Sequence, residues 1–104
     1  MKFLVIGTMP TEAGNRLVRQ GKLASNIQAI LESIKPEAVY FAERNGKRTV
    51  FMIVEMTDAS QIPSIAEPMF LGFDGEVEFH PVMLPSDLAK AGPGIEAAAK
   101  KFGS

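Results

Sequence analysis

Two kinds of hydrophobic spacing alternate along this chain and predict its first elements. An unbroken apolar run at residues 3–8 is typical of a central strand that is covered on both faces. Apolar residues then recur every three or four positions over 17–34, which predicts one apolar stripe on a long helix ending near Pro36. Pro10 suits the first turn of this helix, and Gly21 marks a point where it is expected to kink.

A hairpin is the clearest unit in the sequence. Two strand-like segments, residues 38–43 and 48–56, flank Asn45-Gly46, which is the strongest short-range hairpin signal. With a two-residue loop, Tyr40 lies opposite Phe51, and side-chain alternation then defines two faces. One face carries Val39, Phe41, Val50, Met52 and Val54, and the other carries Ala38, Tyr40, Thr49, Phe51, Ile53 and Glu55.

The second half of the chain predicts a shorter helix and a fourth strand. Asp58 is a suitable N-cap, and apolar residues keep helical spacing as far as Met69. Pro68 is expected to end or bend this helix. Residues 77–84 then form a strand, and Pro81 removes a hydrogen-bond donor from it, which predicts a position at the sheet edge.

The resulting order, β-α-β-β-α-β followed by a helical tail, predicts an α+β fold. It is the order of the ferredoxin-like plait, a four-stranded antiparallel sheet with two helices on one face. We expect a single domain over residues 1–104, with the plait in 1–84 and the tail in 85–104. Within the tail, two helical segments are expected on either side of Gly92-Pro93-Gly94.

One copy of this plait would leave an apolar face without a cover. An antiparallel face that meets solvent normally alternates into polar residues. Here the face turned away from the helices still carries Tyr40, Phe51 and Ile53. A homodimer is the simplest cover for such a patch, and the alternative is that the C-terminal helix folds over it.

Charge is distributed unevenly, although the net charge is only -1. Residues 1–48 contain eight Lys and Arg against four Asp and Glu, whereas residues 49–88 contain seven acidic and no basic residues. The hairpin strand and the last strand lie at opposite edges of a plait, so one edge is expected to be basic and the other acidic. Two stacked sheets would bring unlike edges together. The alternative is a solvated surface of little energetic consequence.

Composition excludes several kinds of site. The 104 residues include no Cys and one His, which excludes a disulfide scaffold, a thiolate zinc site and a multi-histidine metal site within one chain. A sequence pI of about 5.8 argues against general nucleic-acid binding. The apolar run near Met1 is too short for a signal peptide or a membrane span. We therefore expect a cytoplasmic protein with no cofactor, no metal, and no nucleic-acid or membrane partner.

His80, Glu78 and Glu55 are the candidate catalytic residues. Histidine is the side-chain type best suited to exchange protons near neutral pH. Glu78 lies two residues before His80 and therefore points to the same face of the strand, and Glu55 is expected at the end of a neighbouring strand. Such a group suits proton transfer next to a carbonyl or a ring. The alternative is an edge-strand histidine that faces solvent or a dimer seam.

Tyr40, Phe51 and Met52 are the candidate ligand-binding residues. A tyrosine can donate a hydrogen bond to a ligand oxygen, and methionines line adaptable apolar pockets. The alternatives are an interface position for Tyr40 and simple core packing for Met52.

These residues also carry a resemblance to a known superfamily. Residues 62–70 (IPSIAEPMF) and 77–83 (VEFHPVM) are similar to segments of small, stand-alone bacterial members of the dimeric α/β-barrel superfamily. Residues 1–84 resemble that superfamily in topology and length. The resemblance implies two ferredoxin-like sheets that face each other in a homodimer. It also implies a distant relation to muconolactone-isomerase-like and cyclase-type barrel proteins.

Two departures limit what the resemblance implies about activity. The chain has no Trp, so the Trp-containing sites of quinol and haem-degrading monooxygenases in this superfamily do not carry over. Cyclase-type members use a His and a Tyr, and His80 is similarly placed on the last strand, but Tyr40 lies on the second strand.

Two functions are therefore expected. The first is a homodimer that binds a small apolar molecule between sheet and helices, with isomerase- or cyclase-like proton transfer by His80, assisted by Glu78, Glu55 or Tyr40. The second is a non-catalytic interaction or regulatory module whose sheet face serves only assembly. The reaction class comes from the resemblance and not from the residues alone.

Overall fold

The computed structural model describes residues 1–104 and confirms the predicted α+β fold. Its four strands form one sheet in the order β2-β3-β1-β4, and every neighbouring pair is antiparallel. The edge position predicted for β4 is confirmed. In chain order the elements are β1 (Lys2–Thr8), α1 (Thr11–Arg19), α2 (Leu23–Ile34), β2 (Ala38–Arg44), β3 (Lys47–Glu55), the 3-10 turn η1 (Ala59–Gln61), α3 (Ile62–Phe73), β4 (Glu76–Pro81), α4 (Pro85–Lys90) and α5 (Gly92–Phe102).

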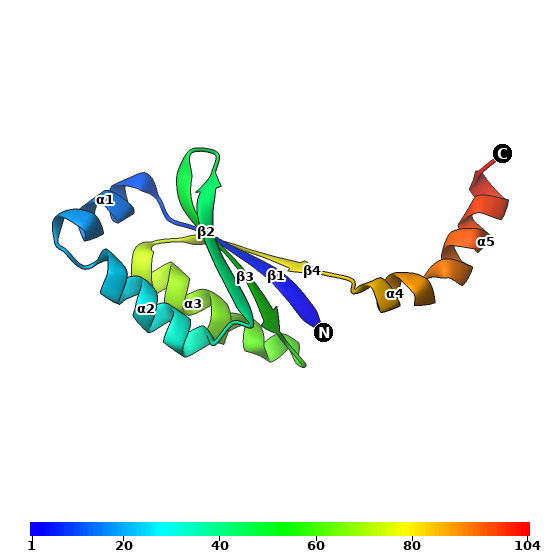
Figure 1. The fold of residues 1–104 in the computed structure, drawn as a ribbon, viewed down its shortest axis with the longest axis horizontal. Coiled ribbons are helices and arrows are strands. Elements are labelled where there is room, and N and C mark those ends of the chain that lie inside the picture. The colour runs from blue at the N-terminus through cyan, green and yellow to red at the C-terminus, as the bar shows by residue number, and fades with distance from the viewer.

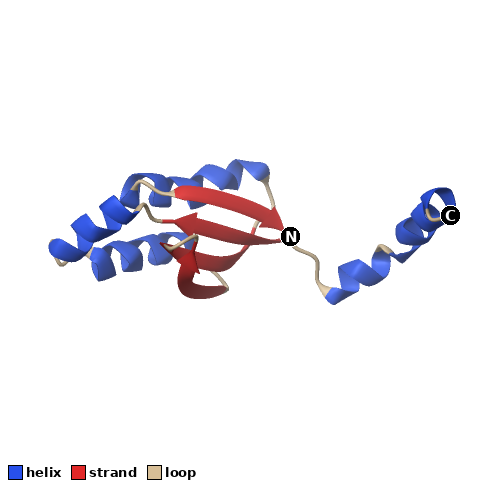
Figure 2. Ribbon diagram, turned by 90° about the horizontal axis from the view of Figure 1, so that it is seen from above, coloured by secondary structure: helices blue, strands red, loops and turns tan.

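The core lies between the sheet and the helices. Figures 1 and 2 show α2 and α3 side by side on one face of the sheet, with no element covering the other face. Met52 from β3, Val5 from β1 and Met69 from α3 are each less than 2% exposed. Asn26 of α2 fixes the two helices together, because its Nδ2 donates to the carbonyl of Gly72 in α3 at 2.7 Å.

The hairpin register is confirmed. Tyr40 pairs with Phe51, and the loop is the two-residue Asn45-Gly46 turn. Both loop residues have positive φ, at 55° and 75°, as the type I′ turn requires. The Glu43 carboxylate accepts the Gly46 amide at 2.9 Å and fixes the turn further.

The single long helix predicted from Pro10 to near Pro36 is wrong, because the chain forms α1 and α2 as separate helices, which part at Gly21, where the kink was expected. Gly21 lies between them with φ of 67°, a left-handed conformation that glycine adopts without steric cost. The turn lets Leu17 of α1 and Leu23 of α2 both pack against the core.

The helix does not end at Pro68, one of the two predicted outcomes, because α3 continues to Phe73 with Pro68 inside it. Pro68 has no N–H for the carbonyl of Ser64, but Ser64 is exposed and solvent can bond that carbonyl. The helix is held by its buried face, where Ile65 and Met69 contact the core.

The C-terminal helices project from the body of the protein. In Figures 1 and 2, α4 and α5 extend away from the sheet and do not fold over its open face. The predicted break falls at Ala91, and Gly92 and Pro93 form the first turn of α5. Leu88, Ile95 and Phe102 of this tail are between 52% and 77% exposed. The sheet face therefore stays uncovered within one chain.

Candidate functional site

The open face of the sheet is apolar in its middle and charged at the β4 edge. The strand register sets two rows of side chains across it from β2 to β4. The first row is Tyr40, Phe51, Ile6 and Glu78, and the second is Ala38, Ile53, Leu4 and His80.

An ion pair crosses this face. Arg44 Nη1 of β2 lies 2.9 Å from Glu78 Oε2 of β4, although these strands are at opposite edges of the sheet. Three strand spacings would separate the edges by about 14 Å in a flat sheet. The twisted and curled sheet, visible in Figure 2, brings the two side chains within reach. Ile6 is the β1 residue opposite Glu78 and is only 5% exposed. The basic and acidic edges thus pair here within one chain.

Two of the three predicted catalytic residues are in contact. His80 Nε2 lies 3.1 Å from Glu78 Oε1, and Glu78 uses its other oxygen for Arg44. The three side chains form a partly exposed chain of polar contacts along the open face. This arrangement can orient the histidine ring.

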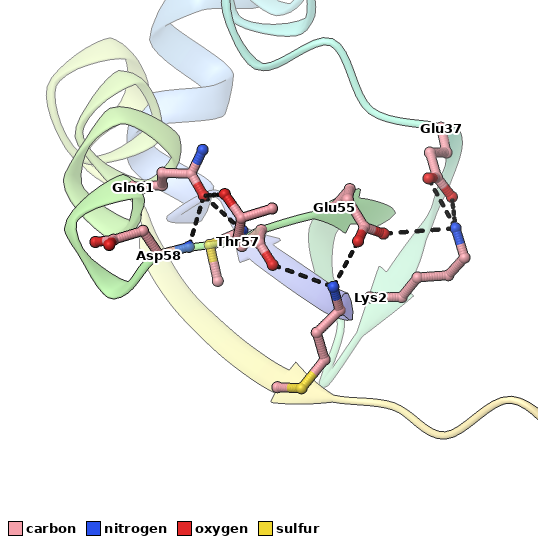
Figure 3. Close-up of polar contacts among 8 residues, drawn as sticks. Lys2, Glu37, Glu55, Thr57, Asp58 and Gln61 are labelled. Carbon is pink, nitrogen blue, oxygen red and sulfur yellow. Dashed lines mark hydrogen bonds and ion pairs between the residues drawn. The ribbon is translucent and has the colours of Figure 1, made fainter. Parts of the chain in front are cut away.

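Glu55 is not part of that group. It lies on β3 opposite Lys2, and its carboxylate accepts the N-terminal ammonium of Met1 and lies 3.7 Å from Lys2 Nζ (Figure 3). The ammonium hydrogen bond lowers the pKa of Glu55. Lys2 also donates to Glu37 at 2.6 Å, and this hydrogen bond raises the pKa of Lys2. Glu55 therefore takes part in joining the N-terminus to the end of the hairpin.

A capping box joins β3 to α3 beside this cluster. The Gln61 Oε1 atom accepts the amides of Thr57 at 2.8 Å and Asp58 at 3.1 Å, as Figure 3 shows. The Asp58 carboxylate accepts the Ser60 amide at 2.8 Å. Hydrogen bonding to the Ser60 side chain, and then to this amide, lowers the pKa of Asp58. The predicted N-cap role of Asp58 is confirmed.

The three predicted ligand-binding residues are divided between the two faces of the sheet. Tyr40 is 69% exposed on the open face, and Phe51 lies beside it and is partly buried. Met52 faces the helices and is 1% exposed. No single pocket brings Met52 together with Tyr40.

A cavity of about 380 Å³ lies between the sheet and the helices, under the hairpin. Seven of its ten lining residues are hydrophobic, and its volume is within the range of small-molecule sites. Phe41, one of its lining residues, is 60% exposed. The lining residues are Gly7, Met9, Leu23, Ile27, Phe41, Ala42, Arg48, Thr49, Val50 and Phe73.

Arg48 is the charged residue of this cavity, and sequence reasoning did not single it out. Its Nη2 donates to Asn15 Oδ1 of α1 at 3.1 Å. Gly14 gives it room, because a Cβ at that position would meet the Arg48 guanidinium. Two signals in the sequence pointed here: a glycine inside a predicted helix, and an arginine on the same hairpin face as the core residue Val50.

The rest of the structure offers no metal centre. No three His, Cys, Asp or Glu side chains gather in a way that could hold an ion. None of the helices combines the length and the apolar character that crossing a membrane requires.

Residues 1–95 match the family model DUF3303, described as a domain of unknown function. No curated protein matches the chain.

Acid should destabilise this protein partly through Glu55. Its pKa is lowered in the folded state, so its stabilising contribution is present above the ordinary value of 4.5 and is lost as the pH falls through the folded value. Urea unfolding of Glu55→Gln should therefore show a shallower loss of stability on acidification than wild type. Glu67→Gln, on an exposed part of α3, is the matched control and should keep the wild-type slope. Equal slopes for wild type and Glu55→Gln would contradict this assignment.

Proposed function

Since the chain belongs to the DUF3303 family, a domain of unknown function, we propose its function from the geometry: a homodimer that binds a small, largely apolar molecule between sheet and helices. The apolar cavity of about 380 Å³ is the observation that carries this proposal. It lies where the first sequence hypothesis expected a ligand.

The cavity is held open by rigid elements. Met9 follows β1, and its amide donates to the carbonyl of Arg48 at 2.9 Å, which ties the start of α1 to β3. Gly7 forms part of the floor, where an added Cβ would meet Met69 Sδ at 2.5 Å. Leu23 and Ile27 of α2 form the opposite wall. A site built on strands and helices in this way needs little rearrangement to accept an apolar ligand.

The open face supports the homodimer. Tyr40, Phe51 and Ile53 form an apolar surface on the side of the sheet that no helix covers. Large contiguous apolar patches are rare on monomers, and a two-fold axis lets one patch cover itself in a second copy. A second copy that covers this face would also meet the Arg44–Glu78 ion pair, which crosses it.

A second candidate function is acid–base catalysis on the open face. The His80–Glu78 contact of 3.1 Å favours it, because a carboxylate beside a histidine is a common proton-transfer arrangement. His80 is on the face opposite the apolar cavity, so its substrate would lie between two facing sheets. The reaction class would be an isomerase- or cyclase-like proton transfer without a cofactor.

Filling the cavity should abolish binding of a neutral apolar probe. We expect the Leu23→Trp variant to lose calorimetric binding of 1-decanol, because the indole occupies the space that the probe needs. Leu71→Trp is the control, since Leu71 is 81% exposed on α3 and does not line the cavity. Both variants should unfold cooperatively. Unchanged 1-decanol binding by Leu23→Trp would refute the cavity as the site.

Native mass spectrometry should give twice the chain mass of 11.3 kDa for the wild type. Phe51→Asp should give the single-chain mass, because a buried, unpaired carboxylate opposes closure of the apolar interface. Phe102→Asp, in the exposed part of the tail, should remain a dimer. A wild-type mass of one chain would overturn the dimer.

His80→Gln separates the second candidate from pure binding. It should reduce turnover of any substrate found for the protein by about 100-fold or more, the usual contribution of a general acid or base, while the dimer mass stays unchanged. Glu78→Gln should reduce it less, because the histidine remains. If His80→Gln alters neither ligand affinity nor turnover, the catalytic function is wrong and the open face serves assembly alone.

A further inference from the structure

We infer that the ligand of the sheet–helix cavity is an apolar carboxylate whose anionic head binds Arg48. This inference rests on the proposed function and deepens it by naming the chemical class of the ligand. The observation behind it is that the Arg48 guanidinium lines an otherwise apolar cavity and forms no ion pair with an acidic residue.

Arg48 is exposed and has few hydrogen-bonding partners. It lines the cavity from β3, and no carboxylate oxygen lies within the 4.0 Å that defines an ion pair. Its one side-chain hydrogen bond goes to the neutral amide oxygen of Asn15 at 3.1 Å. A guanidinium has five N–H donors in a planar fork, so most of them remain for a ligand.

Gly14 of α1 and the Arg48 side chain fit each other closely. A Cβ on Gly14 would meet the guanidinium and would lie 2.8 Å from Met9 Sδ. Glycine weakens a helix interior relative to alanine, yet α1 has one at the point where the arginine crosses it. The arginine is therefore fixed between α1 and β3, which reduces the entropy that a ligand must remove on binding.

Glu43 is the acidic group nearest to Arg48 in the strand register, directly opposite it across the hairpin. Its Oε2 atom instead accepts the amide of Gly46 at 2.9 Å. The neighbouring α1 residue Arg16 is occupied with Asp74 at 3.2 Å. The hairpin turn thus engages the nearest carboxylate and leaves the guanidinium available.

The surroundings of Arg48 decide the ligand class. A single guanidinium matches the single charge and the two oxygens of a carboxylate, which it can bind with two parallel hydrogen bonds. The body of the ligand must be apolar, because hydrophobic side chains such as Ile27 and Phe41 provide the walls. Aliphatic and aryl carboxylic acids have both features.

The test compares decanoate with 1-decanol, two probes that share a ten-carbon chain and differ at the head group. By calorimetry at neutral pH, wild-type protein should bind decanoate about tenfold or more tightly than 1-decanol. Arg48→Met should remove this preference, so that the two probes bind with similar affinity. Gly14→Ala should act in the same direction by displacing the guanidinium. Arg19→Met, an exposed arginine of α1 outside the cavity, is the matched control and should change neither affinity.

The possible outcomes distinguish failure of the carboxylate inference from failure of the proposed apolar binding site. Equal wild-type affinities, with no effect of Arg48→Met, would overturn the carboxylate and leave the apolar site standing. Binding of neither probe would overturn the apolar site itself. If Arg48→Met fails to fold, Arg48→Lys takes its place: it keeps a charge but loses the fork, and an unchanged preference for decanoate would then exclude the two-bond contact.

Discussion

The structure depends on the packing of α2 and α3 against one face of the sheet. Met69 of α3 and Val5 of β1 are completely buried, and Met52 of β3 is almost so. Together they fix the distance between the two layers. Everything outside this contact is less constrained. The helices and the sheet are in direct contact where α3 lies on β1, but they leave a cavity under the hairpin. The chain turns at Gly21, and no residue of α1 lines this cavity. A cavity at that end is the consequence of two short helices where one long helix would have continued.

The same packing leaves the sheet with two unequal faces. The helix-covered face supplies the core and the cavity, and the open face combines apolar residues with the ion pair of Arg44 and Glu78. An exposed ion pair adds little to stability by itself. It links the two edge strands across the open face, which the twist and curl of the sheet allow. The same curvature determines which surface a second sheet could meet.

Short-range sequence signals predicted the fold well, but they could not predict side-chain contacts between distant strands. The Asn45-Gly46 turn determined the hairpin register, and Pro81 determined the edge position of β4, because each depends on a single backbone property. Helix periodicity predicted one continuous helix, since both helices continue the same apolar stripe, and only Gly21 marked the point at which α1 and α2 separate. Arg44 and Glu78 are 34 residues apart and meet only because the whole sheet curls.

The candidate site shows the same division. Spacing by two residues correctly brought His80 and Glu78 together on one strand, but Glu55 needed knowledge of the N-terminus, whose ammonium it accepts. The cavity was harder to foresee, because no motif marks it. Its one chemical signal was a conflict between local and tertiary demands: glycine at position 14 is poor for a helix, but a larger residue there would displace the guanidinium of Arg48. A residue that weakens its own helix indicates that a tertiary contact needs it there. At this position the contact places Arg48 beside the apolar cavity.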